Sequence, residues 1–340
     1  MNFLKRTGNI MSFIGIIILG FFIIAVPAPC KEGIFKGIIV CGRVIIPSLY
    51  PFTMCVFFLM RSGITENLRL FSKPVDRIWV ITLLSLIGGY PVGARLLSNE
   101  IKENRITQDC GKRALNYCIN AGPAFIIGGI GETLFGSQKV GIILFVSHIL
   151  PSLLFSAFLR PKGKTKIEAF PKAYVSFADN FVLSATDAAA ALINICVFVI
   201  LFFGLNAYLE YFNNPLLRAL SLFTEVTGGV MKTKNIYLIS FLLGFSGFCV
   251  WCQIFSAFQD IKINFGVFFL SRLSHASLST LFTFILLKLF PVSLTTYSNG
   301  VIFDKKFIFS TPELSASMLI MSLIFVISLK TKNKILEDII

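Results

Sequence analysis

The sequence predicts an all-α polytopic membrane protein made of two inverted repeats, each with a re-entrant or broken helical hairpin. Of the 340 residues, 55% are hydrophobic and only 14% are charged, which is too apolar for a soluble domain. Several apolar stretches reach the length of about 20 residues that crosses a bilayer core of about 30 Å. Two further stretches are interrupted by Gly and Pro at corresponding places in the two halves, a pattern typical of transporter-like folds.

The long apolar stretches define the expected membrane spans. They are Ile10–Val26, Ile34–Met60, Ala114–Phe135, Val140–Leu159, Phe181–Leu209, Phe265–Phe290 and Leu314–Leu329. The interrupted stretches are Ile78–Leu97 and Tyr237–Phe258. We therefore expect a multi-pass protein of the cell membrane, with membrane lipid as its surroundings.

A basic segment divides the chain into two halves. The segment RPKGKTKIEAFPK is the most basic and least apolar connection in the sequence. We expect a first span at 1–30, repeat 1 at 31–160, a basic cytoplasmic linker at 161–176, an inverted repeat 2 at 177–330 and a tail at 331–340. The net charge of +14 is explained by topology and lipid headgroups, so no nucleic-acid partner is expected.

The first interrupted stretch contains Gly88, Gly89, Pro91 and Gly93, followed by Arg95. Gly and Pro clustered in this way end one half-helix and begin another. Basic residues flank the stretch on both sides, which favours a hairpin that returns to its own side of the membrane over a crossing.

Two asparagines follow the first interrupted stretch. Asn116 and Asn120 are four residues apart, so on the helix expected from Ala114 onward they share one face. Ala121-Gly122-Pro123 then interrupts this helix. Freed backbone groups and two amides could bind a polar ligand, or the asparagines bond to a neighbouring helix.

The second half repeats this order of elements. Glu225 begins an EVTGG motif, Gly247 and Gln253 lie in the second interrupted stretch, and Arg272 and His275 lie on the helix after it. A glycine precedes a polar helix residue by 31 positions in both halves, which corresponds to an offset of 155 residues between them. This register indicates internal duplication.

Together these patterns predict a polar site between the repeats. The candidate residues for binding a small polar solute or a coupling ion are Gly89, Pro91, Arg95, Asn116, Asn120, Glu225, Gly247, Gln253, Arg272 and His275. Polar and ionisable residues inside membrane spans are costly and commonly functional. The alternative, that these residues pair with one another to hold the hairpins in place, remains open.

Enzyme chemistry finds little support in the sequence. The two histidines have no serine or carboxylate partner at a recognisable spacing, and no phosphate-binding glycine loop is present. We expect no catalytic residue, no metal site and no cofactor. Cys249 and Cys252 form a CxxC pair without a second pair at ligand spacing, and a redox role for them is a further hypothesis.

Several motifs carry a family resemblance. GGYPVGARLL followed by ALNYCINAGPAFIIGGIG resembles the signature region of the YlbJ-type sporulation integral membrane proteins. These belong with the spore maturation proteins to the group with the nucleoside-recognition Gate domain. The motifs IIPSLYPF, EVTGG, GFSGFCVWCQ and RLSHA support the resemblance. The sequence departs from the family pattern at the CxxC pair and at the GG after Glu225. Because of both departures, the resemblance does not identify the ligand.

The resemblance implies a protein of the bacterial cytoplasmic or forespore membrane that is connected with spore cortex formation. It also implies a distant likeness to concentrative nucleoside transporters, which have inverted repeats and two re-entrant hairpins. We expect a transporter-like protein that moves or senses a small polar solute. The alternative is a non-transporting membrane scaffold that recruits cortex-assembly partners, with homo-oligomers or other sporulation membrane proteins as its contacts.

Overall fold

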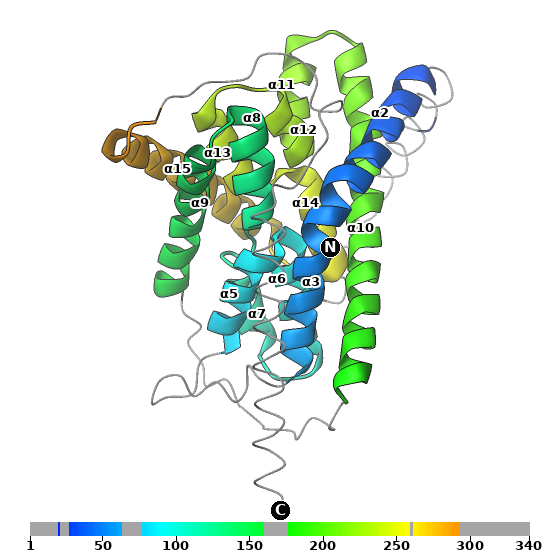
Figure 1. The fold of residues 1–340 in the computed structure, drawn as a ribbon, viewed down its shortest axis with the longest axis vertical. Coiled ribbons are helices and arrows are strands. Elements are labelled where there is room, and N and C mark those ends of the chain that lie inside the picture. The colour runs from blue at the N-terminus through cyan, green and yellow to red at the C-terminus, as the bar shows by residue number, and fades with distance from the viewer. Residues whose placement is uncertain (1–19, 21–26, 63–76, 160–175, 259–260, 293–340) are drawn as a thin grey trace, which may run out of the picture.

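The computed structural model describes residues 20, 27–62, 77–159, 176–258 and 261–292, which form a bundle of helices (Figure 1). These described residues contain no β-strand. Five helical segments are long and apolar enough to cross a membrane, namely Pro27–Arg61, Gln138–Phe158, Phe177–Tyr211, Ile236–Ala257 and Phe265–Leu289. The predicted all-α polytopic membrane fold is confirmed, whereas the predicted spans Ile10–Val26, apart from Gly20, and Leu314–Leu329 lie outside the described residues.

The first described helix is continuous but irregular. It consists of α2 (Pro27–Val40), the π-helical turn η1 (Cys41–Ile45) and α3 (Ile46–Arg61), with one proline in the first turn of α3 and another inside it. A proline removes a backbone donor and its ring clashes with the preceding turn. The wider π-helical turn directly before α3 is a way to accommodate this misfit.

The longest helix, α10 (Phe177–Tyr211), packs antiparallel against this first helix (Figure 1). Gly33 lies against the backbone of Phe203, whereas the Cys41 Sγ, further along α2 and η1, lies 3.8 Å from the carbonyl oxygen of Cys196. A Cβ at Gly33 would overlap the Phe203 carbonyl oxygen. Glycine therefore permits the close approach of the two helices, as small residues do in membrane bundles.

The first interrupted stretch forms a helical hairpin. Its arms are α5 (Arg77–Gly88) and α6 (Tyr90–Lys102), separated by Gly89 with a φ of 86°. A Cβ placed on Gly93 would lie 2.7 Å from the Cβ of Ser85, although eight residues span about 12 Å along a straight helix. The predicted break at Gly89 is confirmed, and α6 folds back onto α5.

The structure of the segment after this hairpin differs from the prediction. The expected helix from Ala114 onward is wrong, because α7 (Gln108–Ala114) ends there and residues 115–122 are not helical. The chain continues as the π-helix η2 (Ala124–Glu132) and the short α8 (Thr133–Phe135). Asn116 and Asn120 therefore do not share a helix face.

Local chemistry and packing explain why residues 115–122 are not helical. Pro123 disfavours the helical conformation for the residue before it. A Cβ on Gly93 would overlap the carbonyl oxygen of Cys118, so this irregular backbone lies directly against α6. Membrane proteins tolerate such backbone where other protein groups satisfy it.

The second half contains the matching broken stretch. The remaining helices are α9 (Gln138–Phe158), α11 (Pro215–Thr224), α12 (Val226–Met231), α13 (Ile236–Phe245), α14 (Gly247–Ala257) and α15 (Phe265–Leu289). The break between α13 and α14 falls at Ser246 and Gly247, whose φ values are 68° and 77°, as the sequence predicts. The inversion of the repeats and the domain boundaries stay predictions.

Candidate functional site around Glu225

A narrow cavity of about 60 Å³ lies between the two broken stretches. Its walls come from η1 and α3, from α6, from α10 and from the segments around α12 and α14. Four of the predicted site residues line it, namely Gly89, Pro91, Glu225 and Gln253. The structure thus brings together residues that are far apart in the sequence.

Glu225 provides the carboxylate of this cavity. It lies between α11 and α12 in an extended conformation and is only 2% exposed. Its Oε1 accepts a hydrogen bond from the backbone N–H of Thr227 at 3.0 Å, and its Oε2 accepts one from Gly228 at 2.6 Å. The carboxylate therefore caps α12, where a negative group meets unpaired N–H donors.

No described lysine or arginine forms an ion pair with Glu225. A buried carboxylate without a cationic partner is costly. Two backbone donors reduce that cost, and a proton or a cation in the adjacent space would neutralise the remaining charge. The arrangement can hold a small cation or a polar group that donates hydrogen bonds.

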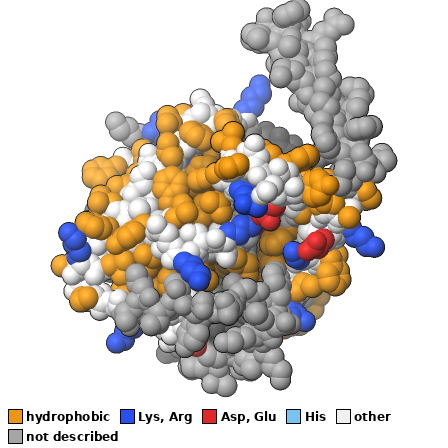
Figure 2. Space-filling view, turned by 90° about the horizontal axis from the view of Figure 1, so that it is seen from above, with side chains coloured by type: hydrophobic (Ala, Val, Ile, Leu, Met, Phe, Trp, Pro, Cys, Tyr) orange, Lys and Arg blue, Asp and Glu red, His pale blue; other side chains and the backbone are white. Residues whose placement is uncertain are grey.

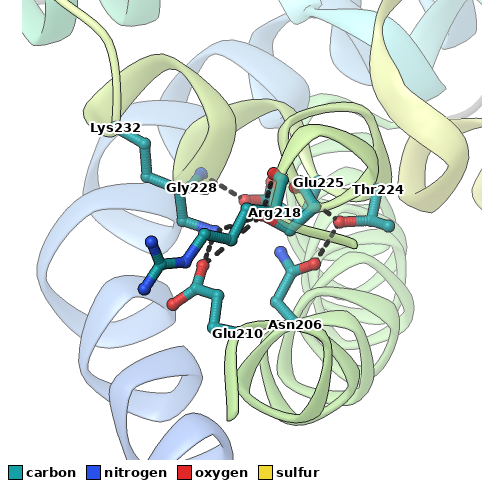
Figure 3. Close-up of polar contacts among 8 residues, drawn as sticks. Asn206, Glu210, Arg218, Thr224, Glu225, Gly228 and Lys232 are labelled. Atoms are coloured by element: carbon teal, nitrogen blue, oxygen red, sulfur yellow. Dashed lines mark hydrogen bonds and ion pairs between the residues drawn. The ribbon is translucent and has the colours of Figure 1, made fainter. Parts of the chain in front are cut away.

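Further polar side chains lie near Glu225 (Figure 3). They lie towards the end of the molecule that Figure 2 shows from above. The hydroxyl of Thr224 donates to Asn206 Oδ1, and Lys232 forms an ion pair with Glu210. Figure 2 shows that this end is largely hydrophobic, with a small group of acidic and basic side chains among the apolar ones. Buried polar groups thus connect Glu225 with a charged pair near the surface.

Gly228 packs closely beside the carboxylate of Glu225. A Cβ added to this glycine would lie 3.3 Å from Glu225 Oε2 and 3.9 Å from Asn206 Nδ2. The carboxylate of Glu225 and the amide of Asn206 therefore border the same narrow space.

A second group of predicted residues lies elsewhere, in a buried contact with the irregular backbone. Arg272 on α15 is fully buried, and its Nη1 donates to the carbonyl oxygen of Ile119 at 2.9 Å while its Nη2 donates to that of Asn116. Both acceptors belong to the non-helical residues 115–122. The guanidinium thus replaces hydrogen bonds that a helix would have made there.

Histidines from α9 and α15 complete this contact. His275 Nε2 lies 3.0 Å from the carbonyl oxygen of His148, and the ring centroids of the two histidines are 4.8 Å apart. His148 Nε2 accepts a hydrogen bond from the backbone N–H of Ala121 at 2.9 Å. The pair therefore also holds the non-helical segment, next to Arg272.

Asn120 is surrounded by protein groups. Its Nδ2 donates to the carbonyl oxygen of Tyr117 at 3.0 Å and lies 3.5 Å from Ser85 Oγ, while its Oδ1 accepts from the hydroxyl of Ser152. These bonds join the non-helical segment to α5 and α9. In this arrangement Asn120 holds three parts of the chain together.

The other three predicted residues occupy separate places. Gly247 packs at the start of α12, where an added Cβ would lie 3.1 Å from the backbone nitrogen of Val226. The side chain of Asn116 donates to the carbonyl oxygen of Lys112 at 3.4 Å. Arg95 lines a different, larger cavity. None of the three lines the central cavity.

Sequence reasoning missed Asn206 and the partnership of the two histidines. Asn206 is a polar residue inside the apolar stretch Phe181–Leu209, which is a recognisable signal. His148 and His275 are 127 residues apart, so no local spacing indicated their contact. Among the described residues, no group of three or more His, Cys, Asp or Glu side chains is arranged to hold a metal ion.

Comparisons with known proteins connect this fold to sporulation. No family model matches the chain, and no solved structure matches it. The chain is 24% identical over 326 residues to the "Sporulation integral membrane protein YlbJ" of Bacillus subtilis (strain 168), with 78% of this chain and 79% of the relative covered. The predicted resemblance to YlbJ-type proteins is confirmed, whereas the grouping with the Gate domain stays a prediction, and the chain is a multi-pass membrane protein similar to a sporulation membrane protein.

Proposed function

We propose that the chain is a non-enzymatic, transporter-like membrane protein of sporulation and spore cortex formation that moves or senses a small polar solute or coupling ion at Glu225. The observation that carries this proposal is a buried carboxylate at the wall of a cavity between two broken helices. Transporters place their binding sites beside such breaks, at the interface of two repeats.

Two cavities and a polar group that lie at successive positions along α10 support the proposal. Asp187 near one end of this helix lines the larger cavity, and Val199 lines the central cavity. Asn206 and Glu210 near the other end belong to the polar group above Glu225 (Figure 3). One helix therefore borders both cavities and the polar group, which are the places that a route through the bundle would use.

The inverted repeat is part of the proposal, and long-range contacts support it. Cys41 contacts Cys196, which lies 155 residues later in an antiparallel helix. Where a two-fold axis passes between antiparallel helices, equivalent residues meet each other. The backbone of Gly89 is also close to Gly122, as that of Gly244 is to Ala276, and these pairs are again about 155 residues apart.

The size of the central cavity limits its occupant. About 60 Å³ is room for an ion or a few water molecules and is less than the roughly 300–1,000 Å³ of small-molecule sites. A nucleoside, which the Gate resemblance would suggest, requires a more open conformation. The geometry therefore favours a coupling ion or proton at Glu225, with any larger solute bound after opening.

Reconstitution tests the proposal. The full chain in proteoliposomes would be given a Na⁺ or proton gradient, with and without uridine, and ion flux would be followed with an enclosed dye. We expect flux through the unmodified protein and none through Glu225→Gln. Glu132→Gln is the matched control, because the carboxylate of Glu132 accepts a hydrogen bond from the exposed Gln138 and does not line the central cavity, and it should keep normal flux.

Two outcomes would overturn the proposal. Flux that persists in Glu225→Gln would remove that residue from the route. An absence of flux under every gradient, together with a stoichiometric partner that co-purifies with the chain, would favour the scaffold. Expression in a Bacillus subtilis strain lacking YlbJ, with heat-resistant spores counted, would then measure whether Glu225 is needed for sporulation.

A further inference from the structure

A second cavity, of about 450 Å³, opens between the end of α3, the second half of α6 and α10. We call it the vestibule. Charged side chains from all three helices line it. Arg61 on α3 forms an ion pair with Asp187 on α10, and Arg105 pairs with Glu100 at 3.1 Å and also with Glu103.

Arg95 differs from the other charged residues of the vestibule. It is half-buried on α6 and makes no ion pair or hydrogen bond within the described part of the chain. The three carboxylates around it are already engaged by the other two arginines. A guanidinium that is partly removed from water and unpaired is unfavourable. An anion that bound to Arg95 would therefore be stabilising.

We propose that the vestibule is an anion site in which Arg95 binds a carboxylate or phosphate group, carried by a soluble anion or by a lipid headgroup. The planar guanidinium matches both groups through paired hydrogen bonds. The cavity volume lies within the range of small-molecule sites. A cation would instead meet an unpaired arginine and carboxylates already in ion pairs.

The site is independent of Glu225, because the two residues line different cavities. They are nevertheless connected through α6. This helix begins at the central cavity with Tyr90 and Pro91 and reaches the vestibule four residues later at Arg95. An anion bound at Arg95 therefore lies on the arm of the hairpin that also borders the central cavity.

Binding of inorganic phosphate tests the proposal. The full chain would be placed in nanodiscs of phosphatidylcholine, and phosphate binding would be measured by calorimetry at constant ionic strength set with chloride. We expect Arg95→Gln to weaken phosphate binding by at least about tenfold. Arg218→Gln is the control, because Arg218 is an exposed arginine on α11, and it should bind like the unmodified chain.

Nanodiscs containing phosphatidylglycerol distinguish the two sources of the anion. Retention of phosphatidylglycerol by the unmodified chain but not by Arg95→Gln, without binding of free phosphate, would identify a lipid headgroup. Free phosphate bound in phosphatidylcholine discs would identify a soluble anion. If Arg95→Gln changes neither measurement, the proposal is overturned.

Measurements of thermal stability distinguish an anion-binding role of Arg95 from a structural role. Without phosphate, Arg95→Gln should shift the unfolding midpoint by less than about 2 °C, because no protein partner loses a bond. Arg61→Gln removes an existing ion pair with Asp187 and serves as the comparison. A larger loss of stability in Arg95→Gln than in Arg61→Gln would mean that Arg95 supports the fold, and the proposal would fail.

Discussion

The central cavity around Glu225 and the buried contact around Arg272 are both polar and both inside an apolar bundle, yet they differ in what surrounds them. Arg272 donates to two backbone carbonyls of an irregular segment and is fully enclosed. Glu225 is equally buried but borders open space. Burial alone therefore does not identify a binding residue, since buried polar groups are expected to be hydrogen-bonded in either case. The free volume beside the group makes the distinction.

Arg272→Met should give the largest loss of stability. It leaves the carbonyl oxygens of Ile119 and Asn116 without their donors, and each unsatisfied buried group costs about 1–3 kcal/mol. We expect a reduced amount of protein in the membrane and an unfolding midpoint lowered by several degrees. Normal abundance of the protein combined with lost ion flux would instead indicate that Arg272 has a binding role and not a structural one.

Asn120→Ala should have an intermediate effect. The substitution removes bonds to Tyr117 and Ser152 but leaves partners that can rearrange, so we expect a loss of about 1–3 kcal/mol. Thermal unfolding in detergent would measure it, with residual ion flux scaled to the amount of folded protein. Full stability with no flux would show that Asn120 acts on a ligand.

Gly228→Ala should have the smallest effect on stability and a clear effect on function. The added methyl group would lie 3.3 Å from Glu225 Oε2 and crowd the carboxylate, while alanine at this position of α12 is favoured over glycine by up to about 1 kcal/mol. We expect an unchanged unfolding midpoint and weaker ion flux. Gly266→Ala is the matched control, because its added Cβ would meet only Asn264 Oδ1, at 3.5 Å, and unchanged flux in Gly228→Ala would contradict the assignment.

The breaks in the fold could be predicted from the sequence because they follow from local backbone chemistry. Gly89 and Gly247 adopt positive φ values that other residues rarely reach. Glu225, which the sequence predicts as a site residue, lines the central cavity. Its binding role stays a prediction until flux is measured.

The irregular segment at residues 115–122 could not be predicted in the same way. It is stabilised by a donor on α15, Arg272, and by the close approach of α6 at Gly93. These groups lie far away in the sequence, so no local rule reveals them. For the same reason, the division of the candidate residues between a cavity and a structural contact appears only when the tertiary packing is known.

The length of α10 has a consequence for the surrounding lipid. Its 35 residues extend for about 52 Å, whereas the hydrocarbon core is only about 30 Å thick. The helix must therefore tilt or project into the headgroup layers, and its tilt adjusts to membrane thickness. Because α10 borders the vestibule, the central cavity and the polar group above Glu225, a thinner or thicker membrane shifts the walls of all three together. Acyl-chain length is thus a physical variable that acts on this protein without any ligand.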